Sequence, residues 1–230
     1  MTELAIDVKR LTKKFGSRIV VNNIDIQVPK GKIYGFFGPN GSGKTTTIRM
    51  LCGLLTPDAG EGTCLGYDIM AQTQMIRKKV GYMTQKFSFW DDLTIQENVE
   101  FTANIFGMDH VSERTREALV KLGLQHRSDQ SAGTLSGGWK QRLALAACIL
   151  HQPEILLLDE PTAGVDPKAR RELWDELGRL SEDGMTILVS THYMDEAERC
   201  HELIYIAYGN LIVRGSTQQV IDQTHLKTLE

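Results

Sequence analysis

The sequence predicts an α/β fold: a core with a mostly parallel sheet, an N-terminal antiparallel β layer and a helical subdomain. Three observations lead to this fold class. Short, continuous apolar runs typical of buried strands alternate with helical patterns. Two stretches near the N-terminus alternate apolar and polar residues, as half-exposed antiparallel strands do. A long middle stretch has mostly the periodicity of helices.

The individual elements follow in chain order. The two half-exposed strands are LAIDVKRL and IVVNNIDIQV, and the first buried strand, KIYGFF, leads to a helical run from Thr45 to Leu55. The middle stretch holds TIQENVEFTANIF, SERTREALVKLG and GWKQRLALAACIL, the remaining buried strands are EILLLD, MTILVS and LIYIAY, and one short helix follows Gly215. We expect a single domain over residues 1–230, with a core of about 1–85 and 152–230 and a helical subdomain of about 86–151.

Composition and charge exclude several classes of protein. Of the 230 residues, 41% are hydrophobic, which is enough for a sizeable core. The net charge of −3 argues against a nucleic-acid surface, which is usually basic. The N-terminus has no apolar signal-peptide region, and no apolar run is long enough to cross a bilayer. The cysteines have no metal-like spacing, so we expect free thiols in a reducing cytosol.

Residues 38–45, GPNGSGKT, match the phosphate-binding pattern GxxxxGK[ST] between an apolar strand and a helical run. In this motif the loop amides face the phosphates, Lys44 reaches the β- and γ-phosphates, and the Thr45 hydroxyl binds Mg²⁺. The flanking strand and helix disfavour the alternative, a glycine-rich surface turn. The candidate nucleotide-binding residues are Gly38, Pro39, Asn40, Gly41, Ser42, Gly43, Lys44, Thr45 and Thr46.

The run ILLLDEP places Asp159 and Glu160 at the carboxyl end of a buried strand, where ligands bind in α/β sheets. We expect Asp159 to hold Mg²⁺ and Glu160 to polarise an attacking water. The alternative is an acidic cap on the strand end. GTPases lack the second carboxylate at this place, so the pair favours ATP hydrolysis.

LSGGWKQR, residues 135–142, looks like a second glycine-rich helix start. The exposed amides at a helix N-terminus favour an anion. A chain of this size therefore carries two candidate phosphate sites, and the second needs an explanation.

Together the motifs resemble the ATP-binding cassette (ABC) family over essentially the whole chain. The order matches: GPNGSGKTT as Walker A, YMTQ as the Q-loop, LSGGWKQR as the signature, ILLLDEP as Walker B, AGVDP as the D-loop and STHYMDEAE as the H-loop. The resemblance implies that Ser136, Gly137 and Gly138 contact the γ-phosphate of ATP on a partner cassette. Two cassettes would thus meet head to tail around two ATP molecules, which explains the second phosphate site.

The resemblance also implies roles for four other residues. Phe15 would stack on adenine, unless it is a packed strand-end aromatic. Gln85 would approach Mg²⁺ and the attacking water, unless it is a plain loop glutamine. Asp166 would communicate across the dimer, although it could simply cap a helix that begins at Pro167. His192 would reach the γ-phosphate.

Two further observations concern the residues around these motifs. His192 and Glu196 have i,i+4 spacing, but two possible ligands without a third are poor evidence for a metal site. Trp139 replaces the glutamine that is usual after the second signature glycine. It should leave the phosphate site intact and alter packing near the partner or the helical subdomain.

The resemblance implies that ATP hydrolysis drives a separate membrane permease. The loop after Gln85, with Phe87, Phe89 and Trp90 beside Asp91 and Asp92, looks like the surface that receives a permease helix; the alternative is that the rings form the core of the helical subdomain. A cytoplasmic location, peripheral on the inner face of the cell membrane, follows. The expected partners are a second cassette, as a homodimer or a tandem pair, and permease subunits, with no nucleic acid.

The segments LTIQENVEF, AGVDP and THYMDEAERC most resemble the sequences of the bacterial drug- and antibiotic-export branch of the ABC family. We therefore expect export of a drug or another small hydrophobic compound. The alternative, a soluble cassette acting on ribosomes or DNA, would have two cassettes with a charged linker or long coiled coils, and neither pattern is present. A regulatory module with a dead site is disfavoured, because Lys44, Gln85, Asp159, Glu160 and His192 are all present. The sequence is also compatible with a cassette trimmed from a longer polypeptide.

Overall fold

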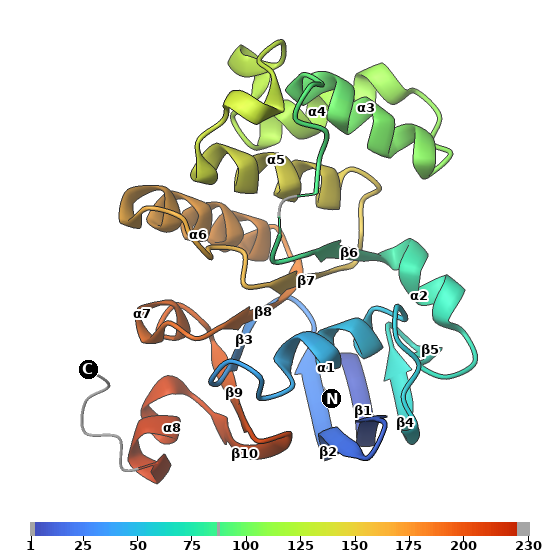
Figure 1. Cartoon of the computed structure of the whole chain (residues 1–230), viewed down its shortest axis with the longest axis vertical. Helices are drawn as coiled ribbons and strands as arrows, with labels where there is room; N and C mark the ends of the chain where they lie inside the picture. Colours follow the sequence, from blue (N-terminus) through green and yellow to red (C-terminus); the bar gives the residue numbers. More distant parts are fainter. Residues whose placement is uncertain (1–2, 87, 225–230) are drawn as a thin grey trace.

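The computed structural model describes residues 3–86 and 88–224 (Figure 1). Its elements are β1 (Leu4–Phe15), β2 (Arg18–Pro29), β3 (Ile33–Phe37), α1 (Lys44–Leu51), β4 (Ala59–Cys64), β5 (Tyr67–Asp68), α2 (Thr73–Lys79), β6 (Val80–Met83), α3 (Ile95–Ile105), α4 (Val111–Lys121), α5 (Gly137–Ile149), β7 (Ile155–Asp159), α6 (Pro167–Glu182), β8 (Thr186–Thr191), α7 (Met194–Ala197), β9 (Glu202–Ala207), β10 (Asn210–Gly215) and α8 (Thr217–Thr224), with 3-10 turns at Gln125–Arg127 and Ala132–Thr134.

A six-stranded sheet in the order β10-β9-β3-β8-β7-β6 forms the centre of the molecule. All its neighbouring strands are parallel except the edge pair β9 and β10. The strand β3 lies between two strands from the far end of the chain, with Ile33 opposite Ile187 and Tyr34 opposite Glu202. The carboxyl ends of β3, β6, β7 and β8 therefore meet at one edge of the sheet.

Both faces of this sheet are covered, which explains the continuous apolar strands. On β7, Leu156 and Leu158 belong to a core shared with the helices α3 to α6. Ile155 and Leu157 belong to a second core shared with α1 and the antiparallel strands. Each strand residue thus needs an apolar side chain, whichever face it occupies.

The N-terminal layer is a second sheet in the order β2-β1-β4-β5, with antiparallel pairing throughout. Its alternating burial matches the alternating sequence of its first two strands. The predicted α/β class, mostly parallel sheet, antiparallel layer and helical subdomain are confirmed. The sequence analysis did not identify β4, β5, α2, β6, α7 and β10 as elements.

One predicted boundary is wrong. The helical run expected to reach Leu55 ends at Leu51, because Gly53 adopts a left-handed conformation with φ of 70°. The Leu54 amide then donates to the Arg49 carbonyl at 2.9 Å, which closes the last turn.

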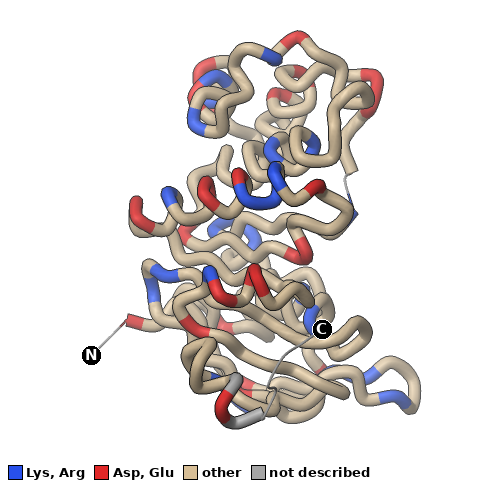
Figure 2. Tube along the Cα trace, turned by 90° about the vertical axis from the view of Figure 1, so that its left-hand side faces the viewer, with Lys and Arg blue, Asp and Glu red and all other residues tan. Residues whose placement is uncertain are grey.

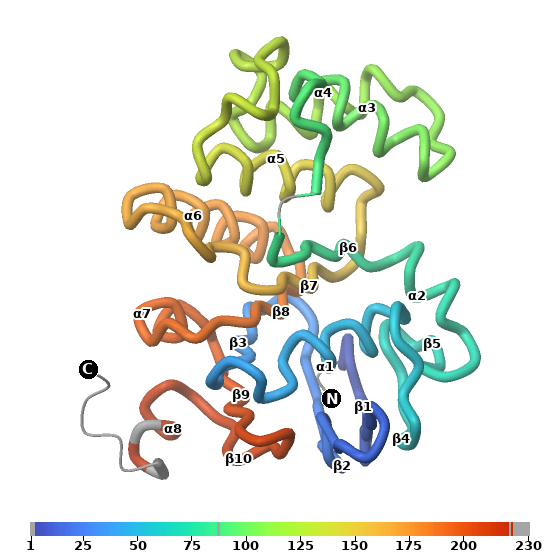
Figure 3. Tube along the Cα trace, in the orientation of Figure 1, coloured from blue at the N-terminus to red at the C-terminus, as the bar shows by residue number. Residues whose placement is uncertain are grey.

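The chain passes into the helical subdomain after β6 and returns through the end of α5 to β7 (Figure 3). The helix α3 begins with a capping box, in which Thr94 and Glu97 satisfy each other's backbone amides. The exact limits of the subdomain, about 86–151, stay a prediction. On the side seen in Figure 2, Lys and Arg are interspersed with Asp and Glu.

No helix in residues 3–86 or 88–224 combines the length and apolar character needed to cross a membrane. All four cysteines are free thiols, as the sequence analysis expected. Burial raises the pKa of Cys64, Cys148 and Cys200 to about 12. These thiols therefore stay protonated at neutral pH.

Candidate active site

The loop between β3 and α1 requires glycine at both ends. Gly38 has φ of 153°, and a Cβ there would overlap the Ile206 carbonyl. Gly43 has φ of 106°, and its Cβ would lie 2.7 Å from the Val20 carbonyl. The loop backbone is therefore packed closely against two neighbouring strands, and other residues cannot replace these glycines without moving it.

Lys44 lies under this loop, 4% exposed. Its Nζ donates to the carbonyls of Gly38 at 2.7 Å and Pro39 at 3.1 Å. Burial lowers the pKa of Lys44, and the nearby charge of Glu160, 3.6 Å away, opposes that shift. The ammonium group is thus held where the loop would present the β- and γ-phosphates.

Thr45 and Asp159 form a pair of oxygen donors. The Thr45 hydroxyl donates to Asp159 Oδ1 at 3.0 Å, and Ser190 donates to the same oxygen at 2.7 Å. The Ser190 hydroxyl also accepts from the Glu160 amide at 2.9 Å. A hydroxyl and a carboxylate are the ligands that Mg²⁺ prefers, so the residues fit this ion. The sequence analysis missed Ser190; its position just before Thr191 and His192 is the only signal.

Glu160 is the centre of the site, at the end of β7 and 8% exposed. Its Oε1 lies 3.6 Å from Lys44 Nζ and 3.5 Å from His192 Nδ1. Its Oε2 accepts from Gln85 Nε2 at 2.8 Å. Three residues from three other segments therefore meet at this one carboxylate. A left-handed backbone at Glu160, with φ of 48°, directs the chain away from the sheet at this point.

The signature residues lie elsewhere. In Figure 1, α5 is separated from α1 by α6 and β7. Among the described residues, no hydrogen bond or ion pair joins Ser136, Gly137 or Gly138 to this cluster. Ser136 and Gly137 are exposed, and the Ser136 side chain makes no capping hydrogen bond. Gly138 is buried, and a Cβ there would overlap the side chain of Ala169 on α6.

The remaining candidates have different surroundings. Phe15 is 52% exposed, with Lys13 Nζ 5.7 Å from its ring, so it is not a packed core aromatic. Asp166 caps α6 by accepting from the amides of Lys168 and Ala169, at 3.1 and 3.0 Å. This cap is the alternative that the sequence left open, and it leaves a cross-dimer role untested.

Trp139 contacts its own helical subdomain. Its ring lies 4.6 Å from the Arg127 guanidinium and 5.5 Å from that of Arg142. Arg142 in turn pairs with Glu172 and Glu176 on α6, at 3.4 and 3.2 Å. The tryptophan therefore contributes to the packing between the subdomain and α6.

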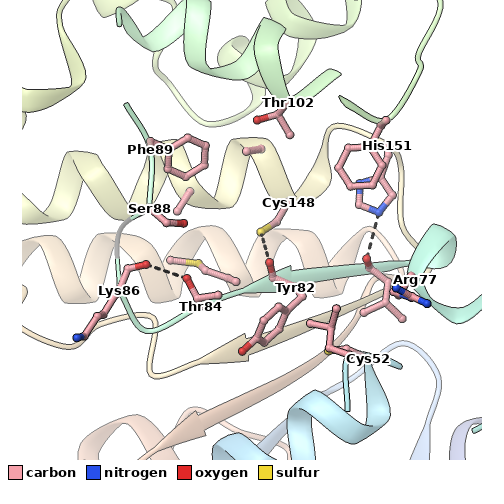
Figure 4. Close-up of a pocket in the computed structure, with 16 residues that line it drawn as sticks. Cys52, Arg77, Tyr82, Thr84, Lys86, Ser88, Phe89, Thr102, Cys148 and His151 are labelled. Atoms are coloured by element: carbon pink, nitrogen blue, oxygen red, sulfur yellow. Dashed lines mark hydrogen bonds between the residues drawn. The ribbon is translucent and has the colours of Figure 1, made fainter. Parts of the chain in front are cut away.

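A groove of about 350 Å³ opens beside the Q-loop, between β6 and the helices α3 and α5. Figure 4 shows Tyr82 on the β6 side, with Phe89, Thr102 and Cys148 on the helical side.

Trp90 is 52% exposed, and its ring lies 5.5 Å from that of Phe101. The loop aromatics thus differ: Phe89 packs against the core while Trp90 is at the surface, and Phe87 lies outside the described residues.

A glycine loop between a buried strand and a helix, a lysine bonded to that loop and a carboxylate pair at the end of a parallel strand define a P-loop nucleotide hydrolase. The chain belongs to the ABC transporter family, whose model matches residues 21–163. It carries the ATPase cassette of that family.

Similar proteins are ATP-binding subunits. The probable multidrug ABC transporter ATP-binding protein YbhF of Escherichia coli K12 is 40% identical over 224 residues, which are 96% of this chain and 39% of that protein. The chain thus spans about two fifths of this relative. The Nod factor export ATP-binding protein I of Burkholderia lata is 41% identical over 223 residues, 94% of this chain and 72% of that protein.

Solved structures have the same fold. CbiO1 of Clostridium perfringens, part of the ABC transporter complex cbiONQ, has a TM-score of 0.87 and 25% identity over 97% of this chain and 93% of that one. An ATP-binding cassette of an ABC transporter in its ADP conformation has a TM-score of 0.84 and 24% identity, and supports the fold alone.

Proposed function

We propose that this chain hydrolyses Mg²⁺-ATP as one half of a head-to-tail pair of cassettes and thereby drives an export permease. The Glu160 carboxylate, in reach of Lys44, Gln85 and His192, is the observation that carries the proposal. A buried carboxylate surrounded by these three cationic or polar groups can take a proton from a water at its surface. The test is ATP turnover by the purified chain, with release of phosphate as the readout.

Each residue has a distinct task in this proposal. Lys44 binds the β- and γ-phosphates, and Phe15 stacks on the adenine. Glu160 orients and deprotonates the attacking water, Gln85 holds that carboxylate from the end of β6, and His192 contacts the γ-phosphate. Bound through Thr45, Asp159 and Gln85, Mg²⁺ would neutralise charge on the phosphate oxygens.

The second cassette explains the exposed end of α5. Its first amides lack a side-chain cap, and α6 and β7 separate α5 from α1, the helix that follows the chain's own phosphate loop. Their orphan N–H groups and the helix dipole can bind the γ-phosphate on another cassette. The partner is a second copy or the other half of a tandem pair.

Turnover should depend on protein concentration. Because half of each site would come from another cassette, the ATPase rate of the purified chain should rise faster than linearly as concentration increases. Phosphate release across a broad dilution series measures this. A constant specific activity would contradict the shared site.

The groove beside Gln85 is our candidate for the permease contact. It lies next to the residue that touches Glu160, so a helix seated there could influence hydrolysis. One relative is named for multidrug transport and another for Nod factor export, which supports an export role. Such a role places the chain on the inner face of the cell membrane. We propose a drug or another small hydrophobic compound as the substrate, selected by the permease.

Trp90→Ala should uncouple transport from hydrolysis. Trp90 follows Phe89, which lines the groove, and its exposed ring is not part of the core, so basal ATPase and the free energy of unfolding should be unchanged. Efflux in inverted vesicles that contain the permease should be lost. Val120→Ala, at an exposed apolar residue on α4, is the matched control. Normal efflux by Trp90→Ala would remove this loop from the contact.

A further inference from the structure

Glu196 on α7 is a buried carboxylate without a role in the site described above. It is 1% exposed. Its two oxygens accept separate hydrogen bonds, from Thr162 at 2.5 Å and from Thr191 at 2.6 Å. Thr162 follows Glu160 in the loop after β7, and Thr191 directly precedes His192 on β8. A single carboxylate therefore joins the loops that carry two candidate catalytic residues.

Arg170, in the first turn of α6, is the cation nearest to this carboxylate. Its Nε lies 3.5 Å from Glu196 Oε1 and has no hydrogen-bond partner, and one of its Nη atoms lies 3.9 Å from Asp195. The guanidinium carbon is 4.1 Å from the centre of the Tyr193 ring. Stacking on an aromatic ring suits a guanidinium and not an ammonium group.

These contacts hold Thr191 and Tyr193, the residues on either side of His192 in the sequence. The Thr191 hydroxyl donates to Glu196 and accepts from the Tyr193 amide at 3.0 Å. The His192 and Tyr193 rings are 4.1 Å apart. Glu196 fixes the residue before His192, and Arg170 lies against the residue after it. The i,i+4 spacing of His192 and Glu196 thus reflects support of the histidine, and no metal-binding cluster of three or more ligands occurs among the described residues.

We infer that Arg170 and Glu196 are positioning residues that fix His192 to the first turn of α6. That turn is capped by Asp166, four residues before Arg170. A displacement of the Asp166 loop would be transmitted through Arg170 to the histidine. The inference rests on the proposed function, because it assigns His192 to the γ-phosphate.

Glu196→Gln tests this pair. The amide keeps the shape: its oxygen can accept from one threonine and its NH2 group can donate to the other, but Arg170 loses its nearest counter-charge. We expect kcat to fall roughly 10–100-fold, since a small misplacement of a reacting group costs about that much. The KM for ATP and the affinity for ATP should stay within about twofold, because Lys44 and the phosphate loop are untouched. Arg170→Lys should also lower kcat, since lysine cannot reproduce the planar contact with Tyr193.

A second readout separates positioning from general stability. The His192 ring resonances, assigned by comparison with His192→Ala, should shift in Glu196→Gln and Arg170→Lys. Urea unfolding of each variant reports whether it is folded. The matched control is Arg199→Met, which removes an exposed arginine paired with Asp175 at 2.9 Å and should leave kcat and the His192 resonances unchanged.

The outcomes are distinct. A folded Glu196→Gln with wild-type kcat, or a lower kcat with unmoved His192 resonances, would overturn the inference. If Glu196→Gln does not fold, Arg170→Lys decides by the same two readouts. An inactive wild-type chain, or a fully active Glu160→Gln, would instead defeat the proposed function, independently of Glu196.

Discussion

Glu160→Gln should bind Mg²⁺-ATP normally and hydrolyse it roughly 10²–10⁴-fold more slowly, the usual contribution of a general base. The amide has the shape of the carboxylate, and Asp159 keeps its bonds to Thr45 and Ser190. The γ-phosphate should then persist and hold two cassettes together. Single-turnover phosphate release measures the rate, and size exclusion with ATP should show a dimer. Turnover close to wild type would remove Glu160 from the base role.

Adding Ser136→Arg to this variant tests the origin of the dimer. The Ser136 side chain is exposed and makes no capping hydrogen bond, so the fold should tolerate the change. A long side chain would occupy the place of the partner's phosphate, and the double variant should return to monomer with unchanged ATP affinity. An ATP-dependent dimer that survives Ser136→Arg would show that the end of α5 does not bind a phosphate of another cassette.

Lys44→Ala should lower ATP affinity by roughly 100-fold, the loss expected for removal of charge-assisted hydrogen bonds to the phosphates. No other lysine or arginine lies in an ion pair with Glu160 among the described residues, so no other cation is placed to substitute for it. Calorimetry in a Glu160→Gln background measures binding without turnover. Lys79→Ala, at a surface pair with Glu154, is the control and should bind as the parent does. Equal affinities for the two variants would place ATP elsewhere.

The long-range architecture could be predicted because buried parallel strands require apolar residues on both faces. The run EILLLD is continuous for this reason, and β7 lies where it was expected. The strand β4, AGEGTC, has poor intrinsic strand preference and exists because it pairs with β1. The strand β6, at the edge of the other sheet, has only four residues, too few for a periodic signal. Tertiary pairing decides such elements, so local patterns miss them.

The candidate site, like the fold, could be predicted only in part from the sequence. Lys44, Thr45, Asp159 and Glu160 were identified because a loop and a strand end hold them at fixed spacing. Their proximity to Gln85 and His192 follows from the order of the strands, which no single segment encodes. Ser190 was missed because its contact with Asp159 exists only once β7 and β8 are neighbours. The roles of all these residues stay predictions.

The position of β3 also governs when the nucleotide site can form during synthesis. This strand leads into the phosphate loop, yet its partners β8 and β9 are synthesised only after the helical subdomain and β7. Until then β3, which leads to Lys44, lacks its sheet partners, and closing so long a loop is slow because the entropy is lost before the contacts form. The phosphate loop therefore becomes a binding site only after β8 and β9 have been translated.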